Sequence, residues 1–404
     1  MGKEGNSHKT SHTSTQKHKS IRKGNTKKTG GENGMGKNVK PLKRIYQTPT
    51  ETRTLPKELK IIIDGREYTY KRVDTEKPEL KLRYGLNPHQ PAALYIPIED
   101  GWKLSKMKVI KNAKGGISAN NLCDGYNAMR ITAYFQNTKA TSIIKHLNPV
   151  GAAIGETTTQ TIREAWTIDQ RAAYGCVMAT NHEIDVEAAK EITSGNKYIE
   201  CIFAPKYSEE AIEVLSQKRT LRIIEAPTPN PQNPETEYHT PINIRILGDT
   251  IILEEHFHTK ITSLQALRKL DENENTGVVT ERKPEEWEEK WMLYAWWICA
   301  EKSSNGIVLW RENKTIAVAC GQQDRISAIE IAIQKAKRNN HETRGSVLAS
   351  DGFMLPDNIP PIVEAGITAI IQPGGSIHDE EIIRECNRNR ITMIFTGERI
   401  FRHF

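Results

Sequence analysis

The chain has 404 residues, of which 37% are apolar, 26% charged and 6% aromatic, values typical of a soluble protein with two or three domains. This composition excludes a collagen or a coiled coil, and no stretch approaches the roughly 20 consecutive apolar residues that a membrane-spanning helix needs. The first residues also lack the apolar core of a secretory signal, so we expect a cytoplasmic protein without membrane contact.

The formal net charge of +7 originates in the first 45 residues. They hold 12 Lys or Arg residues against Glu4 and Glu32, whereas the rest of the chain holds 45 basic and 48 acidic residues. Few of these residues are apolar, so burial cannot offset an ordering entropy of roughly 1–2 kcal/mol per residue, and we predict a disordered basic tail over residues 1–45. Such a tail serves either RNA or acidic-partner contact, or solubility alone. Solubility is favoured because charged tails are common.

Ordered structure is predicted from about Lys57, where short apolar runs alternate with turn residues. Residues 58–68 are typical of a β-hairpin with Asp64-Gly65 at its turn. Further strands are predicted over residues 141–144, 201–204, 306–309, 315–319 and 367–371. The last of these runs is apolar enough to be buried on both faces of a sheet.

Helices are predicted between these strands. One begins at residues 284–286, because a proline suits the first turn and the acids that follow favour the positive end of a helix. Another covers residues 324–337, where isoleucines recur at three- and four-residue steps. The prolines of residues 226–241 exclude a helix or a central strand and indicate a surface connection between two subdomains. The alternation of strands and helices predicts an α/β fold.

The six cysteines are scattered and form no C-x-x-C pair, so they are interpreted as buried small apolar residues. Neither H-x-E with P-C-x-x-C nor H-E-x-x-H occurs, and a zinc site is therefore not predicted. A Walker-type G-x-x-x-x-G-K-[ST] sequence is also absent, which gives no support to the use of a nucleoside triphosphate.

Five polar or glycine-rich clusters interrupt the apolar pattern and are candidate sites. They are residues 82–90, 120–124, 145–149, 304–305 together with 321–325, and 373–376. Each also has a purely structural explanation, since Asn-Pro and Gly-Gly pairs build turns and Gly321-Gln322-Gln323-Asp324 is typical of a helix cap. One cluster alone therefore does not establish a site.

The pair Lys145-His146 carries the most chemistry, because it follows an apolar strand directly and precedes Asn-Pro. Both side chains are thus expected at a strand end, where α/β proteins place ligands. A histidine can accept a proton from an attacking nucleophile near neutral pH, and an adjacent ammonium can stabilise negative charge on a carbonyl oxygen. The alternative is a turn histidine bonded to backbone.

Taken together, the clusters resemble one family, the formyltransferase region of the bifunctional purine-biosynthesis protein 5-aminoimidazole-4-carboxamide ribonucleotide (AICAR) transformylase/inosinate cyclohydrolase. The resemblance covers about residues 75–404, in the family's order. It runs through Leu82-Arg83-Tyr84-Gly85-Leu86-Asn87-Pro88-His89-Gln90, Lys145-His146-Leu147-Asn148-Pro149-Val150-Gly151, Gly321-Gln322-Gln323-Asp324-Arg325 and Phe395-Thr396-Gly397-Glu398-Arg399-Ile400-Phe401-Arg402-His403.

The resemblance implies formyl transfer from 10-formyltetrahydrofolate to the 5-amino group of AICAR, with no metal in the chemistry. In the family the histidine of the K-H motif, here His146, takes the amine proton as general base. The neighbouring lysine, here Lys145, stabilises the oxyanion of the tetrahedral adduct. The reading of the residues themselves and the family role agree.

The resemblance also implies the binding residues. Those for the nucleotide are Arg83, Tyr84, Asn121, Gly175, Glu200, Arg219, Asn305, Arg325, Phe353, Arg399 and His403. Among them, Arg83, Arg399 and Arg219 can supply the guanidinium partners that a monophosphate needs. Those for the folate are Asp357, Asn358, Pro373, Gly374, Gly375 and Ser376, where the glycines let backbone approach the cosubstrate and a helix opens at Asp379.

Several positions depart from the family's pattern. Glu200 stands where an Asp is usual, which would shift a nucleotide hydroxyl contact by about one methylene. Residues 353–358 form a segment one residue shorter than the family's, and a helical insertion between Arg325 and Ser350 is missing. Only the tail and a short lead-in precede Arg83, so we expect no inosinate cyclohydrolase activity and a separate cyclising protein.

The family's fold implies two tandem cytidine-deaminase-like α/β/α subdomains without zinc. We expect the first, with its lead-in hairpin, over residues 46–245 and the second over residues 246–404. The family also implies a homodimer with active sites shared across the interface. Two alternatives stay open: a non-catalytic purine-nucleotide or RNA-binding protein, and the same transfer with a different formyl donor.

Overall fold

The structure is a computed structural model that describes residues 55–99, 104–231, 237–272 and 276–403. The predicted basic tail, residues 1–45, lies outside the described residues. In the part of the chain that is described, no helix is long and apolar enough to cross a membrane.

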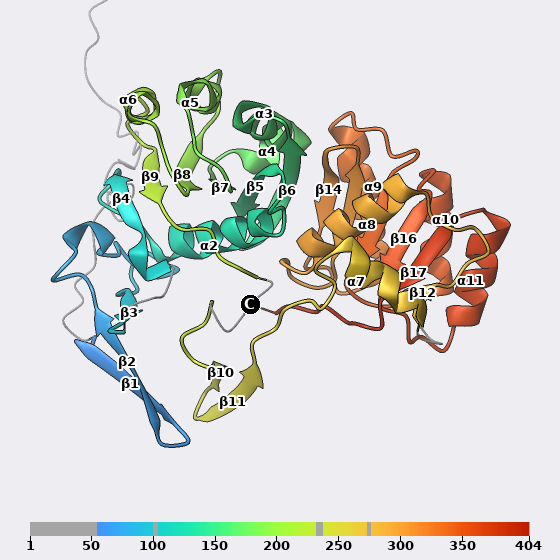
Figure 1. The fold of residues 1–404 in the computed structure, drawn as a ribbon, viewed down its shortest axis with the longest axis horizontal. Helices are drawn as coiled ribbons and strands as arrows, with labels where there is room; N and C mark the ends of the chain where they lie inside the picture. The colour runs from blue at the N-terminus through green and yellow to red at the C-terminus, as the bar shows by residue number, and fades with distance from the viewer. Residues whose placement is uncertain (1–54, 100–103, 232–236, 273–275, 404) are drawn as a thin grey trace, which may run out of the picture. The chain divides into compact units, whose positions relative to one another are not determined.

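The predicted N-terminal hairpin is confirmed. Strands β1 (Glu58–Ile63) and β2 (Arg66–Arg72) pair antiparallel, with Ile63 opposite Arg66. Asp64 and Gly65 form the turn with φ of 48° and 82°, the left-handed conformation that a two-residue hairpin turn requires. Strand β3 (Tyr95–Pro97) adds a third strand beside β2, and Figure 1 shows this small sheet in blue.

The main sheet has twelve strands in the order β12-β17-β16-β15-β13-β14-β6-β5-β7-β8-β9-β4. Its first half consists of β4 (Lys108–Lys111), β5 (Lys139–Lys145), β6 (Asn148–Gly155), β7 (Cys176–Thr180), β8 (Ile199–Ala204) and β9 (Arg222–Glu225). Its second half consists of β12 (Gly277–Val278), β13 (Ile307–Arg311), β14 (Lys314–Ala319), β15 (Val347–Ser350), β16 (Ala369–Gln372) and β17 (Thr392–Phe395).

The two halves repeat one topology. In each, an antiparallel hairpin (β5-β6 or β13-β14) is followed by three mutually parallel strands (β7-β8-β9 or β15-β16-β17), the first of which pairs antiparallel to the hairpin. A short antiparallel strand, β4 or β12, closes each outer edge. The halves join where β6 pairs antiparallel to β14, with Ala153 opposite Lys314. No short sequence period signals this repeat, because it lies in the order of elements.

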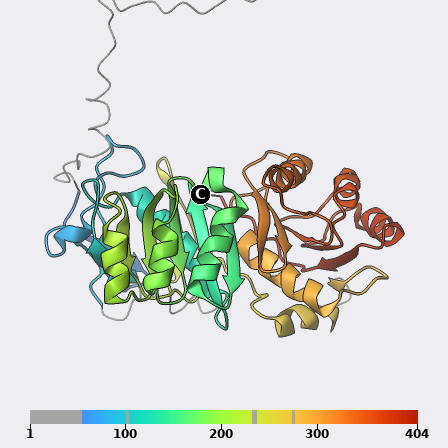
Figure 2. The same ribbon diagram turned by 90° about the horizontal axis from the view of Figure 1, so that it is seen from above.

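Helices cover both faces of this sheet. On one face lie α2 (Ala119–Ala133) and α8 (Glu286–Cys299), whose apolar side chains belong to one core cluster that continues from the first half into the second. The other face carries α3 (Thr158–Ile168), α5 (Val186–Thr193) and α6 (Glu209–Ser216) in the first half. It carries α9 (Arg325–Arg338), α10 (Ile359–Glu364) and α11 (Asp379–Arg388) in the second. Figure 2 shows α3, α5 and α6 in a row.

Helix α2 approaches the sheet closely because residue 125 is a glycine. A Cβ placed on Gly125 would lie 2.2 Å from the ring of Phe203 on β8. Glycine in a helix interior costs about 1 kcal/mol relative to alanine, but here it lets the helix axis come close enough to pack on an aromatic ring. This contact sets the height of α2 above the strands, and α2 holds much of the site described below.

The remaining elements connect these layers. Between the halves, β10 (Ile242–Leu247) and β11 (Thr250–Glu255) form an isolated antiparallel hairpin, followed by α7 (Leu264–Arg268) and the 3₁₀ helix η4 (Lys269–Glu272). Smaller elements are α4 (Gln170–Ala173) and the 3₁₀ helices η1 (Pro78–Leu80), η2 (Leu104–Lys106) and η5 (Pro356–Asn358). The boundary expected between residues 245 and 246 falls inside β10.

The other predicted strands and helices are confirmed, with two corrections. All four residues of β16 are buried, as its apolar sequence predicts, and Asp324 caps α9 by accepting a hydrogen bond from the Ser327 amide. Pro284, however, precedes the N-cap Glu285 instead of occupying the first turn of α8. Cys123 is exposed and Cys320 half-buried, because composition does not reveal which side of α2 or of the sheet edge a cysteine occupies.

Candidate active site

The predicted clusters meet at one edge of the twelve-stranded sheet. Strand β5 ends at Lys145, opposite Asn148, where β6 begins. Because β14 runs antiparallel to β6, the end of β14 at Ala319 lies on this same edge. There Ile307 pairs with both Ala319 and Ser350, so β13 begins and β15 ends at this edge too. The antiparallel junction of the halves therefore brings distant motifs together.

Lys145 and His146 lie at the tip of the β5-β6 hairpin, as predicted. His146 and Leu147 form its two-residue turn with φ of 55° and 64°. The His146 side chain is exposed. The ammonium of Lys145 donates a 2.7 Å hydrogen bond to the backbone carbonyl of Tyr174. This hydrogen bond fixes the ammonium at the end of β5 and leaves its other protons available.

Side chains of α2 hold this turn in its left-handed conformation. The Asp124 carboxylate accepts a 2.7 Å hydrogen bond from the Leu147 amide, and the Asn127 amide donates to the Leu147 carbonyl at 3.2 Å. Burial raises the pKa of Asp124, although the backbone N–H groups of the turn oppose this effect. Asp124 lies in the candidate cluster of residues 120–124, but neither Asp124 nor Asn127 was assigned a catalytic or binding role from the sequence.

Four polar side chains recur at every third position of α2: Asn121, Asp124, Asn127 and Arg130, all buried. Each step of three residues turns the side-chain direction by about 60° around the helix. The series therefore begins at Asn121, at the start of α2, and ends at Arg130, which contacts Glu301 after α8. This N-x-x-D-x-x-N-x-x-R spacing is the signal in the sequence that could have identified them.

Asn121 and Glu200 anchor the first cluster. Asn121 completes a capping box with Ser118 at the start of α2. The Glu200 carboxylate accepts a 3.0 Å hydrogen bond from the Tyr198 hydroxyl and lies 3.4 Å from the Lys114 ammonium. Burial alone would raise the pKa of Glu200, but the charge of Lys114 and the hydrogen bonds from Tyr198 and Asn121 lower it. Glu200 is thus held ionised inside a cationic cluster.

Arg83 and Tyr84 belong to the same cluster. The Arg83 guanidinium is buried, donates to the Lys114 carbonyl at 3.1 Å and lies 4.9 Å from the centre of the Tyr84 ring. Burial, reinforced by the neighbouring charge of Arg222, lowers the pKa of Arg83. Arg222 is fully buried at the start of β9 and donates to the Gly116 carbonyl at 2.7 Å. The cluster carries more positive than negative charge, which suits an anionic ligand.

Gly175 lies beside this cluster at the start of β7. Its φ is 79°, a left-handed conformation that favours glycine, and its amide donates to the Tyr198 carbonyl at 2.7 Å. Arg219, in contrast, has an exposed side chain on the turn between α6 and β9. It makes no side-chain hydrogen bond or ion pair with the described residues of this cluster.

The second cluster is organised around Arg325 at the start of α9. Its guanidinium donates to Asp351 Oδ1 and to Asn305 Oδ1, each at 2.6 Å, and to the Ser350 hydroxyl at 2.9 Å. Asn305 in turn donates to the Gln322 carbonyl at 3.0 Å. Burial would raise the pKa of Asp351, but the positive charges of Lys302 and Arg325 lower it. Lys302 was not among the predicted residues.

The C-terminal segment packs against the second cluster and against α2. The Phe401 ring lies near two arginines that were predicted to bind the nucleotide. Its centre is 4.6 Å from the Arg399 guanidinium and 5.9 Å from that of Arg325. Arg402 donates to the Asn127 side chain at 3.5 Å, which links this segment to the Lys145-His146 turn. Arg399, Arg402 and His403 also line a cavity of about 820 Å³ whose other wall is the β10-β11 hairpin and residues 256–260.

Beneath that cavity, Glu301 joins the two halves of the sheet. Its carboxylate accepts hydrogen bonds from Arg130 at 2.8 and 3.0 Å and from Arg402. Although burial would raise it, the charges of Arg130 and Arg402 lower the pKa of Glu301 to about 2. Arg130 also donates to the Glu237 carboxylate and the Tyr238 hydroxyl. This network fixes the end of α2 to the end of α8.

The predicted folate residues have internal partners. Asn358 is buried in η5, where its side chain bonds the Leu355 amide and Asp357. In the loop of residues 373–376, the amides of Gly375 and Ser376 donate to the Asp379 carboxylate at 2.7 and 3.0 Å, so the expected helix does begin there. Gly374 packs against Phe395. Exposed apolar groups nearby are Phe353, Leu355 and Ile377.

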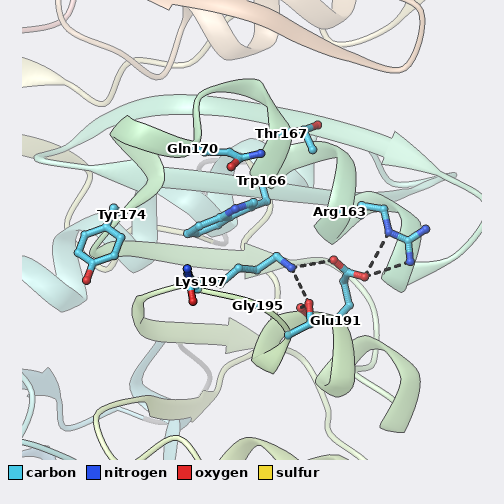
Figure 3. Close-up of a pocket in the computed structure, with 10 residues that line it drawn as sticks. Arg163, Trp166, Thr167, Gln170, Tyr174, Glu191, Gly195 and Lys197 are labelled. Carbon is cyan, nitrogen blue, oxygen red and sulfur yellow. Dashed lines mark hydrogen bonds and ion pairs between the residues drawn. The ribbon is translucent and has the colours of Figure 1, made fainter. Parts of the chain in front are cut away.

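A second cavity, of about 450 Å³, lies between α3 and α5 and contains no predicted site residue. Figure 3 shows its wall, where Trp166 lies between Tyr174 and an ion-pair group centred on Glu191. Glu191 accepts hydrogen bonds from Arg163 and Lys197, and although burial would raise the pKa of Glu191, these partners lower it. The charge of Glu191 is thus compensated by these two partners. Tyr174, whose carbonyl accepts the hydrogen bond from Lys145, lines the end of this cavity nearest the edge that carries the motifs.

A family model described as "AICARFT/IMPCHase bienzyme" matches residues 53–335. The chain belongs to this family. Among curated family members, "Bifunctional purine biosynthesis protein PurH" of Aquifex aeolicus is 35% identical over 325 residues, which are 80% of this chain and 59% of the relative. The PurH protein of Anoxybacillus flavithermus is 34% identical over 343 residues, 84% of this chain and 62% of the relative.

The PurH protein of Halalkalibacterium halodurans is likewise 35% identical, over 83% of this chain and 63% of the relative. The chain thus spans about three fifths of the length of these curated AICARFT/IMPCHase relatives. The residues matched by the family model include the Lys145-His146 turn, all four members of the α2 polar series and Arg325.

Proposed function

We propose that this protein is an AICAR formyltransferase of purine biosynthesis, which moves a formyl group from 10-formyltetrahydrofolate to the 5-amino group of AICAR. The observation that carries the proposal is that the Lys145-His146 turn lies at the same sheet edge as two clusters of charged side chains, one around Glu200 and one around Arg325. Both clusters contain arginines that can bind an anion. A base, an oxyanion-stabilising ammonium and arginines for a phosphate are the groups that this reaction needs.

His146 is proposed as the general base. As the AICAR amine nitrogen bonds to the formyl carbon, the exposed imidazole takes one N–H proton. The formyl oxygen then carries the negative charge, and the Lys145 ammonium, held by the Tyr174 carbonyl, stabilises it. When the bond from the formyl carbon to the donor nitrogen breaks, His146 returns the proton to that nitrogen. The base is thereby restored for the next turnover.

The nucleotide is proposed to bind along the edge that links the two clusters. Arg83 and Arg399 would contact the phosphate through charge-assisted hydrogen bonds. Asn121, Gly175 and Glu200 would meet one part of the nucleotide, and Asn305 and Arg325 another. The cationic excess around Glu200 supports this proposal, as does the Phe401 ring, whose centre lies 4.6 Å from the Arg399 guanidinium and 5.9 Å from the Arg325 guanidinium.

The folate is proposed to bind near residues 353–358 and 373–376. The exposed side chains of Phe353 and Ile377 support this placement, since an apolar surface beside a turn suits the flat ring of a pterin. Because the Asp379 carboxylate already occupies the amides of Gly375 and Ser376, we propose that the loop contacts the folate through its carbonyl groups and its shape.

The duplicated strand order supports two tandem cytidine-deaminase-like subdomains, and we propose that fold assignment on this ground. A homodimer is proposed as well. The β10-β11 hairpin supports it, because Ile246 is 71% exposed and Ile251 is 61% exposed, an apolar surface that a second copy can cover. Replacing both residues with Asp should convert the dimer to monomers in light scattering. A wild-type protein that is monomeric at micromolar concentration would reject the dimer.

We also propose that the protein acts in the cytoplasm and that a separate protein closes the ring to inosinate. The roles proposed above for the described residues all serve formyl transfer. Incubating the purified protein with the formylated nucleotide and following inosinate by absorbance tests this proposal. Formation of inosinate at a rate comparable to formyl transfer would contradict it.

The decisive test is a spectroscopic assay of purified protein with AICAR and 10-formyltetrahydrofolate. His146→Ala and Lys145→Ala should each reduce kcat by at least a hundredfold, roughly the contribution of a general acid–base group. Lys290→Ala on the outer side of α8 is the matched control. Wild-type rates in both site variants would reject the mechanism. Activity with formate and ATP alone would identify a different donor, and nucleotide binding without transfer would indicate a non-catalytic protein.

A further inference from the structure

An ion pair between Lys302 and Asp351 is fully buried behind the second cluster. Lys302 follows α8, and its Nζ lies 3.6 Å from Asp351 Oδ2, with both side chains at 0% exposure. Among the described residues, neither Lys302 Nζ nor Asp351 Oδ2 has a hydrogen-bond partner. Burying an ammonium and a carboxylate costs several kcal/mol per ion, so a pair of this kind is poor evidence of a stabilising role.

The position of the ammonium depends on Gly306. A Cβ placed on Gly306 would lie 0.9 Å from Lys302 Nζ and 3.0 Å from Asp351 Oδ2. The ammonium therefore occupies the space in which any other residue at position 306 would place its side chain. The atom that a Cβ at position 306 would meet is the end of a flexible side chain, so a methyl group there would displace the ammonium from Asp351.

The two oxygens of Asp351 have separate partners. Oδ2 faces Lys302, and Oδ1 accepts the 2.6 Å hydrogen bond from Arg325 Nη1. The other terminal nitrogen of Arg325 donates to Asn305 Oδ1 at 2.6 Å. Lys302 thus stands at one end of a chain of contacts that leads through Asp351 and Arg325 to Asn305.

We propose that Lys302 is a positioning residue, whose ammonium acts as a built-in cation that orients Asp351 and thereby aims Arg325 and Asn305 at the nucleotide. The inference rests on the proposed function, because Arg325 and Asn305 are its proposed nucleotide contacts. Without the ammonium, both oxygens of Asp351 would be available to Arg325. A bidentate pair would form, and Arg325 Nη2 would turn away from Asn305.

The backbone ties this chain of contacts to the rest of the edge. The Asp351 amide donates to the Gly306 carbonyl at 3.2 Å, and the Ile400 amide donates to the Asp351 carbonyl at 3.2 Å. Ile400 adjoins Arg399, a proposed phosphate contact. A change in the orientation of Asp351 is therefore expected to reach the nucleotide. The Lys302 segment also contacts the hairpin that carries Lys145 and His146, because the Ser303 amide donates to Asn148 Oδ1 at 2.9 Å. This contact is made by backbone and not by the Lys302 side chain, so we expect the turn to stay in place.

The test compares Lys302→Leu, Gly306→Ala and the double variant with the wild-type full chain. Lys302→Leu removes the charge, whereas Gly306→Ala keeps the lysine but fills the space of its ammonium. Each single variant should raise the KM for AICAR by roughly tenfold to a hundredfold, because losing a residue that orients a ligand-binding side chain commonly has an effect of this size. We expect kcat and the KM for the folate to change by less than about threefold.

The double variant separates positioning from general damage. Once the ammonium is absent, the Gly306→Ala methyl group has nothing to displace, so the double variant should have the KM of Lys302→Leu within about twofold. Lys290→Leu, which breaks an exposed ion pair with Glu286 on α8, is the matched control and should leave all constants unchanged. Calorimetric titration with AICAR alone gives the same comparison without turnover.

The outcomes are distinct. A wild-type KM for AICAR in both single variants, an equal loss of kcat, or fully additive losses in the double variant would each overturn the positioning role. Loss of folded protein in every variant, measured by circular dichroism, would also overturn it, because the pair would then be structural. A wild-type protein that neither binds nor formylates AICAR would instead reject the proposed function itself.

Discussion

The left-handed turn of His146 and Leu147 gives the sharpest quantitative test of the site. Two non-glycine residues in this conformation cost roughly 1–2 kcal/mol each, so the turn stores about 2–4 kcal/mol. The hydrogen bond from the Leu147 amide to the buried Asp124 carboxylate contributes about 1.5–3 kcal/mol, which is comparable in size. Asp124 therefore decides whether the turn forms.

Asp124→Ala is expected to reduce kcat for formyl transfer by about tenfold to a hundredfold, since each 1.4 kcal/mol corresponds to a factor of ten. The cause is a lower population of molecules with the left-handed turn that positions His146. Initial rates at saturating AICAR and 10-formyltetrahydrofolate measure this effect. Adding Leu147→Gly to Asp124→Ala should restore most of the lost rate, because glycine removes one of the two conformational costs.

Asp185→Ala is a matched control, because Asp185 also accepts a backbone hydrogen bond, from Ala188 at the start of α5, away from the site edge. It should cost about 1 kcal/mol of stability without changing kcat. A wild-type kcat in Asp124→Ala would refute the reasoning. So would a failure of Leu147→Gly to restore activity, since the loss would then not arise from the turn.

Three further predictions concern packing, charge and the tail. Gly125→Ala should destabilise the fold by about 1–3 kcal/mol and lower Tm, because its methyl group would lie 2.2 Å from the Phe203 ring; an unchanged Tm would contradict the close approach of α2. Glu301 has its pKa lowered from 4.5 to about 2 by Arg130 and Arg402 against the effect of burial, so its contribution to stability is complete above pH 4.5 and is lost as the pH falls towards 2. Glu301→Gln should therefore lower the free energy of unfolding at pH 7 by about 3–5 kcal/mol. The free energy of unfolding of this variant should also fall less steeply than that of the wild type between pH 4.5 and about 2. Denaturant titrations at several pH values measure both effects, and an unchanged pH dependence would contradict the role of Glu301. Deleting residues 1–45 should leave kcat and both KM values unchanged, and a large loss in the same spectroscopic assay would show that the tail contributes to catalysis.

Local chemistry explains why much of the fold was predictable from the sequence. Asp64-Gly65 can adopt the conformation that a two-residue hairpin turn needs, and the apolar run at residues 367–371 is stable only where both faces of a strand are covered. The predictions for Pro284 and Cys123 were wrong because each depends on position relative to other elements. A helix start can shift by two residues, and one side of α2 is exposed whereas the other is buried.

The sequence by itself determined the residues of the Lys145-His146 turn and of the Arg325 cluster, because short motifs specify side-chain chemistry and local backbone shape. Their meeting at one edge was decided by the tertiary structure, through the antiparallel pairing of β6 with β14, in which Lys314 faces Ala153. Tertiary structure also decided the roles of Asp124 and Lys302. Their partners lie more than 20 residues away in the chain, at Leu147 and Asp351, and only packing brings such groups within bonding distance.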